Sequence, residues 1–228
     1  MVVFGSMKLI LWDWNGTLLN DTPLNADVFN QVRAELGYEP VSIERYRELY
    51  RHPISKMYED SGFDFSRHPF EDVARRWSEV YRAVPEPPPL HDGARDVLSR
   101  AQGRGSRQAI LSALPHHLLE AAIEHHQLGA FFETVRGATD LLGHSKVAQG
   151  VDLARELGVY GKEISLIGDS SHDAEVAQEL GAGCWLVSHG AESESRLLQT
   201  GYPVCASLGE AYDKMSQAFS SSGEPPDA

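Results

Sequence analysis

The chain has 228 residues, of which 42% are apolar and 23% are charged, ordinary values for a folded domain. This composition excludes a fibrous or wholly disordered chain, and the length favours one sizeable core with an insertion over two full domains. Twenty basic against 33 acidic residues give a net charge of −13. That charge argues against a nucleic-acid partner but allows a small phosphorylated substrate.

The first predicted strand is the apolar run at residues 8–12. The residues before it lack the basic segment and the cleavage site of a signal peptide, and no run approaches the roughly 18 apolar residues of a membrane span. Cys184 and Cys205 lie in separate apolar runs and are too few for a disulfide framework, which predicts a reducing compartment. We therefore expect a cytoplasmic protein that does not bind membranes.

Four further apolar runs follow along the chain. They lie at 108–111, 131–137, 164–167 and 183–187. Amphipathic stretches separate most of these runs and predict helices at 94–102, 116–127, 146–157 and 173–180. Buried strands that alternate with helices predict an α/β fold with a Rossmann-like parallel sheet.

One long segment interrupts this alternation. Residues 20–86 contain no convincing strand, and their patterns predict helices at 24–36, 43–51 and 70–83. The segment ends in a proline-rich stretch that cannot be the interior of a helix. We therefore expect a core of residues 7–19 and 87–218, an inserted helical cap of residues 20–86, and a disordered tail at 219–228.

Polar residues follow three of the predicted strands, where open α/β sheets place their active sites. Asp13 ends the first strand, Gly16 permits a tight turn, and Thr17 offers a hydroxyl and an N–H group to an anion. Ser112 follows the second strand and can offer the same two donors. Lys146 opens a predicted helix, where a cation opposes the helix dipole and so suggests an ion-pair or functional role.

Two further carboxylates follow the strand at 164–167. Asp169 comes directly after it, and Asp173 lies four residues on, within the first turn of the next predicted helix. With Asp13 on the neighbouring strand, they form an oxygen-rich set of side chains suited to Mg²⁺.

In this order the four clusters resemble those of the haloacid dehalogenase superfamily, over roughly residues 7–210. Within it, the chain most resembles phosphoglycolate-phosphatase-like hydrolases with a helical C1 cap. The supporting stretches are DWNGTLLND, HDGARDVL, ILSA, the Ser-Lys pair and IGDSSHDAEVA. The resemblance implies an Mg²⁺-dependent phosphatase that acts on a small phosphorylated metabolite.

The resemblance also implies roles for single residues. Asp13 is expected to be the nucleophile that forms an aspartyl-phosphate, and Mg²⁺ to be bound by Asp13, the backbone carbonyl of Asn15, and Asp169.

Thr17 and Ser112 are expected to bind the phosphoryl oxygens, and Lys146 to pair with Asp13 and the phosphate. Asp173 is expected to orient Lys146 or support the metal.

Asn15 departs from the family pattern, because most phosphatases of this superfamily carry there a second Asp that acts as general acid and base. Asn can supply neither function, and such a loss typically costs about 10²–10⁴-fold in rate. Three interpretations stay open: another group such as His172 or a cap residue supplies the proton, the substrate has a good leaving group, or the chain binds phosphate with little turnover.

A different reaction class is a further alternative. Phosphonoacetaldehyde hydrolases also lack the second Asp and use a cap lysine to form a Schiff base, and Lys56 lies at roughly the corresponding place. Arg45, Arg51 and His52 are candidates to read an anionic group from the cap, and we assign Arg51 to substrate binding. The oligomeric state, monomer or homodimer, stays open.

Overall fold

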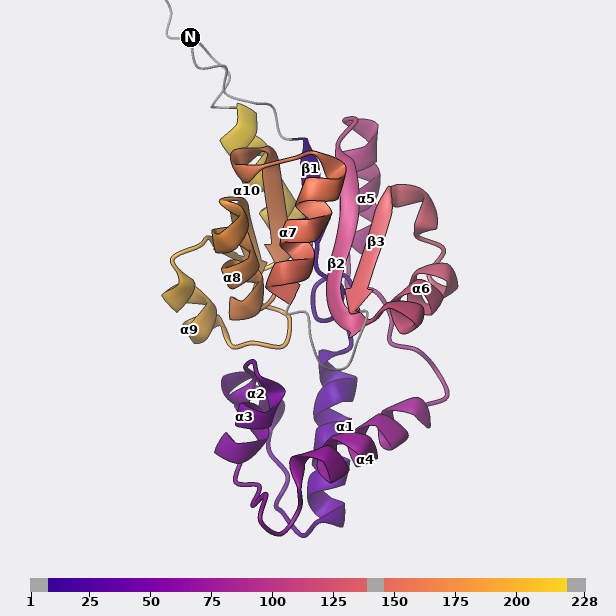
Figure 1. Cartoon of the computed structure of the whole chain (residues 1–228), viewed down its shortest axis with the longest axis vertical. Helices are drawn as coiled ribbons and strands as arrows, with labels where there is room; N and C mark the ends of the chain where they lie inside the picture. Colours follow the sequence, from indigo (N-terminus) through magenta and orange to yellow (C-terminus); the bar gives the residue numbers. More distant parts are fainter. Residues whose placement is uncertain (1–7, 139–145, 221–228) are drawn as a thin grey trace, which may run out of the picture.

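In this computed structural model, which describes residues 8–138 and 146–220, six parallel strands form one sheet (Figure 1). The strands are β1 (Leu9–Trp12), β2 (Arg107–Pro115), β3 (Thr134–Ala138), β4 (Ile164–Gly168), β5 (Gly183–Val187) and β6 (Val204–Cys205). Their order across the sheet is β3-β2-β1-β4-β5-β6, so β1 and β4 are central neighbours. The predicted parallel α/β fold is confirmed.

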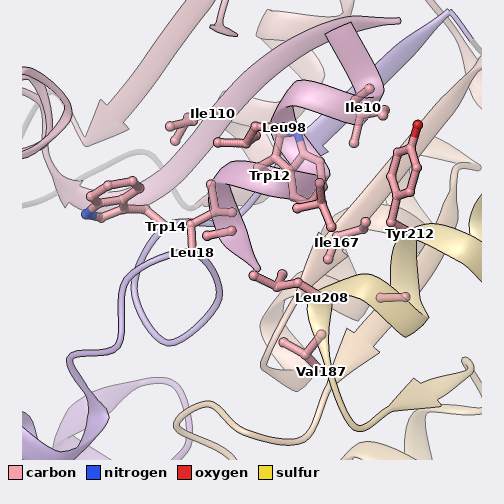
Figure 2. Close-up of a cluster of buried hydrophobic side chains, with 14 of the residues drawn as sticks. Ile10, Trp12, Trp14, Leu18, Leu98, Ile110, Ile167, Val187, Leu208 and Tyr212 are labelled. Atoms are coloured by element: carbon pink, nitrogen blue, oxygen red, sulfur yellow. The ribbon is translucent and has the colours of Figure 1, made fainter. Parts of the chain in front are cut away.

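Helices cover both faces of the sheet. They are α5 (Ala94–Gly103), α6 (His116–His125), α7 (Lys146–Leu157), α8 (Ser171–Leu180), α9 (Glu194–Leu197) and α10 (Leu208–Ser220). Alternate residues of β1 point to opposite faces: Ile10 and Trp12 pack with α5, α6 and α10, whereas Leu9 and Leu11 pack with α7 and α8. Figure 2 shows the first of these clusters, in which Trp12 lies near Leu98. Burial on both faces explains why β1 is a continuous apolar run.

Four helices lie between β1 and α5 in the chain, and Figure 1 shows them beyond the carboxyl ends of the strands. They are α1 (Thr22–Glu35), α2 (Ile43–Leu49), α3 (Ile54–Asp60) and α4 (Phe70–Arg82). Their apolar side chains form a cluster of their own, in which the Phe29 ring lies 5.6 Å from that of Tyr46 and 5.1 Å from that of Tyr58. We refer to these four helices as the cap, and its exact bounds stay a prediction.

The two chain segments that join the cap to the sheet run side by side. Leu19 and Leu90 form an antiparallel bridge, the N–H of Asn20 donates to the Pro89 carbonyl at 2.8 Å, and that of His91 donates to Leu18 at 2.9 Å. These pairings place both connections at the edge of the sheet where Asp13 lies.

The sequence prediction contains no helix at the positions of α3, α9 and α10 and no strand at that of β6. Helix α3 and the two-residue strand β6 are too short to have a recognisable period. Helix α10 extends to Ser220, and the Phe219 ring lies 6.3 Å from that of Trp185, so the predicted disordered tail begins inside a helix. Its remaining residues, 221–228, and residue 7 of the predicted core lie outside the described residues.

Cys184 and Cys205 are buried free thiols, as predicted. Among the helices described here, none has the length and apolar character needed to cross a membrane.

Candidate active site

The loop after β1 brings Asp13 and Thr17 together. The backbone N–H of Asp13 donates to Ile167 of β4, which continues the strand pairing by one residue and fixes the start of the loop. Gly16 then turns the chain with a positive φ of 73°. The turn places the Thr17 hydroxyl 2.9 Å from Asp13 Oδ2 and 3.3 Å from Asp169 Oδ1.

Gly16 is required by space as well as by φ. A Cβ atom at this position would lie 2.1 Å from Asp169 Oδ2. We expect Gly16→Ala to lower activity at least about a hundredfold, because it displaces Asp169 from the site. The measurement is initial rate together with the free energy of unfolding.

Gly37→Ala is the matched control for this prediction. Gly37 has a similar φ of 81°, but nothing lies within 4 Å of its added Cβ. Both variants should lose about 1–2 kcal/mol of stability through left-handed strain, and Gly16→Ala should lose more because its Cβ also clashes with Asp169. Equal activity losses in the two variants would show that the contact with Asp169 is unimportant.

Lys146, the first residue of α7, is buried between two carboxylates. Its ammonium group donates to Asp13 Oδ1 and, at 2.5 Å, to Asp173 Oδ1. The other oxygen of Asp173 accepts hydrogen bonds from the Ser170 hydroxyl at 2.7 Å and from the N–H groups of Ser170 and Asp169. Asp173 therefore holds Lys146 in place and caps α8, and both of its oxygens are engaged.

Asp169 follows β4, and its side chain lies beside Asp13 and Asp173. Its Oδ2 atom accepts the N–H of Ala191 at 2.6 Å, from the loop after β5. This loop carries no recognisable signal in the sequence, because the bond uses a backbone group that no side-chain pattern reveals.

The charges in the cluster strongly affect one another. Burial raises the pKa of Asp13 to about 6, although Lys146 acts in the opposite direction. Burial, together with the charges of Asp13 and Asp173, raises the pKa of Asp169 well above its usual value. Burial lowers the pKa of Lys146, but its two carboxylate partners outweigh this effect and hold the pKa above the usual range. The charged form of Lys146 is therefore favoured.

The same cluster fits a divalent cation. One carboxylate oxygen from each of Asp13, Asp169 and Asp173 lies within 4.8 Å of the others, and all three residues are buried. Three carboxylates against one ammonium leave excess negative charge, which a hard cation with oxygen ligands would neutralise. Lys146 and the donors at the start of α8 engage both oxygens of Asp173. By contrast, Asp13 Oδ2 and Asp169 Oδ1 face the neutral Thr17 hydroxyl, so Asp13 and Asp169 are the better-suited ligands.

Asn15 lies beside a fourth buried acid, Asp21, which is only 1% exposed. The Asn15 amide donates to Asp21 Oδ2 at 2.7 Å, and the Asn25 amide donates to the same oxygen at 2.9 Å. The N–H of Gly16 donates to the other oxygen at 2.8 Å. Burial raises the pKa of Asp21, although these donors act against it.

In the sequence-based prediction Asp21 falls at the start of the cap, residues 20–86, and has no role of its own. Its available signal was a second acid shortly after Asp13, in the stretch LLNDTP.

Ser112 lies close to Asn15, with its hydroxyl 3.4 Å from Asn15 Oδ1. The prediction placed it just after a strand, but it lies inside β2, where the pairing with β3 shifts register between Leu111 and Pro115. The irregularity lets the Leu114 N–H turn back to donate to the Ser112 hydroxyl at 3.1 Å.

Arg51 pairs with another residue of the cap, and its predicted part in substrate binding stays a prediction. Its guanidinium pairs with Asp60 at 2.8 Å. Lys56 pairs with Glu59 at 2.7 Å and is about half exposed, and Arg45 pairs with Glu48. In each case the cation is paired with an acid of the cap.

A cavity of about 710 Å³ lies between this cluster and the cap, with Asp13, Asn15, Asp21 and Lys146 among its lining residues. His52 and His172 also line it, with ring centroids 4.7 Å apart in a stacked arrangement.

Comparison with known proteins agrees with this geometry. Residues 10–187 match the family of haloacid dehalogenase-like hydrolases. A phosphoglycolate phosphatase of Pseudomonas syringae pv. tomato is 26% identical over 197 residues, covering 80% of this chain and 70% of the relative. One from Synechococcus elongatus is 25% identical over 178 residues, covering 77% and 81%.

The fold is also found in solved structures. The crystal structure of a protein from Clostridium acetobutylicum, described as a predicted phosphatase, superimposes with a TM-score of 0.80 at 17% identity, covering 93% of this chain and all of that one. Together the matches indicate a phosphoric monoester hydrolase, as the sequence predicts. Because the family match spans most of the chain, this protein belongs to the haloacid dehalogenase-like hydrolases.

Proposed function

We propose that the protein is an Mg²⁺-dependent phosphatase that hydrolyses phosphate monoesters through an aspartyl-phosphate on Asp13. The observation that carries the proposal is the convergence of Asp13, Lys146 and Asp169 at the mouth of one cavity. Asp13 follows β1, Asp169 follows β4, and Lys146 begins α7, so the three residues come from different elements of the fold.

In the first step, a carboxylate oxygen of Asp13 attacks the phosphorus atom, and the bond from phosphorus to the ester oxygen breaks. Lys146 is already bonded to Asp13, so its charge stabilises the negative charge that develops on the transferring group. The hydroxyls of Thr17 and Ser112, which contact Asp13 and Asn15 respectively, would donate to phosphoryl oxygens of the bound substrate.

In the second step, water attacks the phosphorus atom, which releases phosphate and restores the Asp13 carboxylate. Asp13, the carbonyl of Asn15, and Asp169 would hold Mg²⁺, which when bound shields the anionic nucleophile from the anionic phosphate.

The test is phosphate release from a panel of monoesters, first with Mg²⁺ and then with EDTA. We expect turnover that EDTA abolishes and added Mg²⁺ restores. Turnover that is equal in EDTA would contradict the metal requirement, and inactivity on every ester would contradict the phosphatase.

The carbon–phosphorus hydrolase alternative finds no support in the site. Its Schiff base needs a lysine beside the substrate, but Lys56 is paired with acids on α3 and is not among the residues that line the cavity.

The pair of Asn15 and Asp21 leads to a prediction about the missing acid. In Asn15→Asp alone, the new carboxylate would face that of Asp21 across the present 2.7 Å contact, and one of the two would have to hold a proton. Exchanging the two residues, in Asn15→Asp with Asp21→Asn, keeps the hydrogen bond and the charge. We expect the exchanged variant to hydrolyse ethyl phosphate about a hundredfold faster than the native enzyme, because it regains a general acid beside the leaving group.

The measurement is kcat over a series of leaving groups for the native enzyme, both single variants and the exchanged variant. In the native enzyme kcat should fall steeply as the pKa of the leaving group rises, and in the exchanged variant it should fall less steeply. A flat native series with no gain in the exchanged variant would show that another group supplies the proton.

A further inference from the structure

We propose that the substrate is a small aryl phosphate, a phosphate ester of a phenolic hydroxyl, whose ring occupies the cavity beneath the cap. This inference rests on the proposed phosphatase function and names its substrate class. Two independent observations carry it: the lining of the cavity and the residue at position 15.

The cavity is larger than a two-carbon acid needs, and much of its wall is apolar. Its volume of about 710 Å³ falls within the roughly 300–1,000 Å³ typical of pockets for drug-sized ligands. All four cap helices contribute apolar or aromatic side chains to its wall, including Phe29, Tyr46, Ile54 and Trp77. Such walls favour a flat apolar group, because aromatic rings pack face to edge or in offset stacks.

The wall also lacks a free cation deep inside that could pair with a second anionic group. Among the described lining residues, the lysine and arginine side chains are Lys146 and Arg82. Lys146 is bonded to two carboxylates, and Arg82 is exposed at the end of α4. A buried carboxylate on the substrate would therefore find no free lysine or arginine deep in the wall, and it would depend on hydroxyl and imidazole groups there, which compensate less well for its burial.

Position 15 points to the same class of substrate by a different route. Asn15 cannot protonate a departing oxygen, and its amide is engaged by Asp21. An alkoxide is a poor leaving group unless a general acid protonates it. A phenoxide is far less basic, so its departure depends less on a general acid. A phenolic ester agrees with both observations, because its ring can pack against the apolar wall and its leaving group does not require a general acid at position 15.

Leu118 offers a way to test the wall without disturbing the core. It lines the cavity from α6 and is 41% exposed, an unusual position for a large apolar side chain beside an active site. Leu198 is 60% exposed, does not line the cavity, and provides the matched control.

The experiment compares kcat/KM for 2-naphthyl phosphate, phenyl phosphate, 2-phosphoglycolate and acetyl phosphate. The two aryl esters have leaving groups of similar acidity and differ mainly in apolar area. Acetyl phosphate has a good leaving group but only a small apolar area. We expect 2-naphthyl phosphate to exceed phenyl phosphate about tenfold, since its second ring buries further apolar surface. 2-Phosphoglycolate should be the poorest substrate.

Three variants test whether the wall of the cavity causes the preference for aryl phosphates. Leu118→Ser should lower the ratio of kcat/KM for 2-naphthyl phosphate over acetyl phosphate about threefold, and Trp77→Ala about tenfold, with Leu198→Ser unchanged. Thermal unfolding checks that each variant is folded, and the exposed position of Leu118 keeps the test valid if Trp77→Ala does not fold.

The outcomes separate this inference from the function on which it rests. If esters are hydrolysed but 2-phosphoglycolate equals the aryl esters, or the variants leave the ratio unchanged, the substrate class is wrong and the phosphatase stands. If no ester releases phosphate, both are wrong.

Discussion

Replacement of Asp13 by Asn should abolish turnover while the protein stays folded. A neutral amide is a poor nucleophile towards phosphorus, so we expect kcat to fall at least about a thousandfold. Asn keeps the shape of the side chain, and Lys146 retains its bond to Asp173, so no buried cation is left unpaired. The measurement is initial rate of phosphate release, with thermal unfolding as the check on folding.

The same variant distinguishes covalent from direct hydrolysis. Native enzyme that is quenched in acid during turnover should carry phosphate on the peptide that contains Asp13, and the Asp13→Asn enzyme should carry none. A variant that kept more than about a tenth of the native rate would contradict covalent catalysis by Asp13.

Replacement of Lys146 by Met should affect both stability and activity. The ammonium is buried and balances Asp13 and Asp173, and removing one partner of a buried ion pair typically costs about 3–5 kcal/mol. We expect a loss of that size in the free energy of unfolding at pH 7, together with at least about a hundredfold loss in kcat. Denaturant unfolding and initial rates measure the two effects.

A second substitution separates the two roles of Lys146. Adding Asp173→Asn to Lys146→Met removes one of the three carboxylates and restores the net charge of the cluster. The double variant should regain much of the lost stability, because fewer carboxylates repel one another, but it should stay inactive. If activity returned with stability, Lys146 would be a structural residue and not part of the reaction.

Local sequence patterns determined most of the chemistry at the sheet edge. Asp13 and Asp169 each follow a strand that is buried on both faces, and such strands are recognisable as continuous apolar runs. In a parallel sheet all carboxyl ends lie at one edge, and these two side chains meet there because β1 and β4 are neighbours. Lys146 was found because a cation at the start of a helix needs a partner.

The tertiary structure alone decided which residues surround the substrate. Arg51 and Asp60 are nine positions apart on a turn and a helix of the cap, and their pairing follows from the packing of α3, which no period in the sequence revealed. Asp21 meets Asn15 because the loop after β1 folds back through Gly16, a turn whose direction depends on the space beside Asp169.

The cavity shows most clearly the difference between what the sequence determines and what only the tertiary structure decides. Its aromatic wall comes from four helices whose apolar residues also form the interior of the cap, and their sequence does not distinguish a ring that faces a void from one that is packed. Helical period predicts which face of a helix is buried, but not what buries it. The sequence by itself therefore determined the sheet, its catalytic edge and the family, because these depend on local pattern and strand direction. The lining of the cavity depends on how separate helices pack, and only the folded chain decided it.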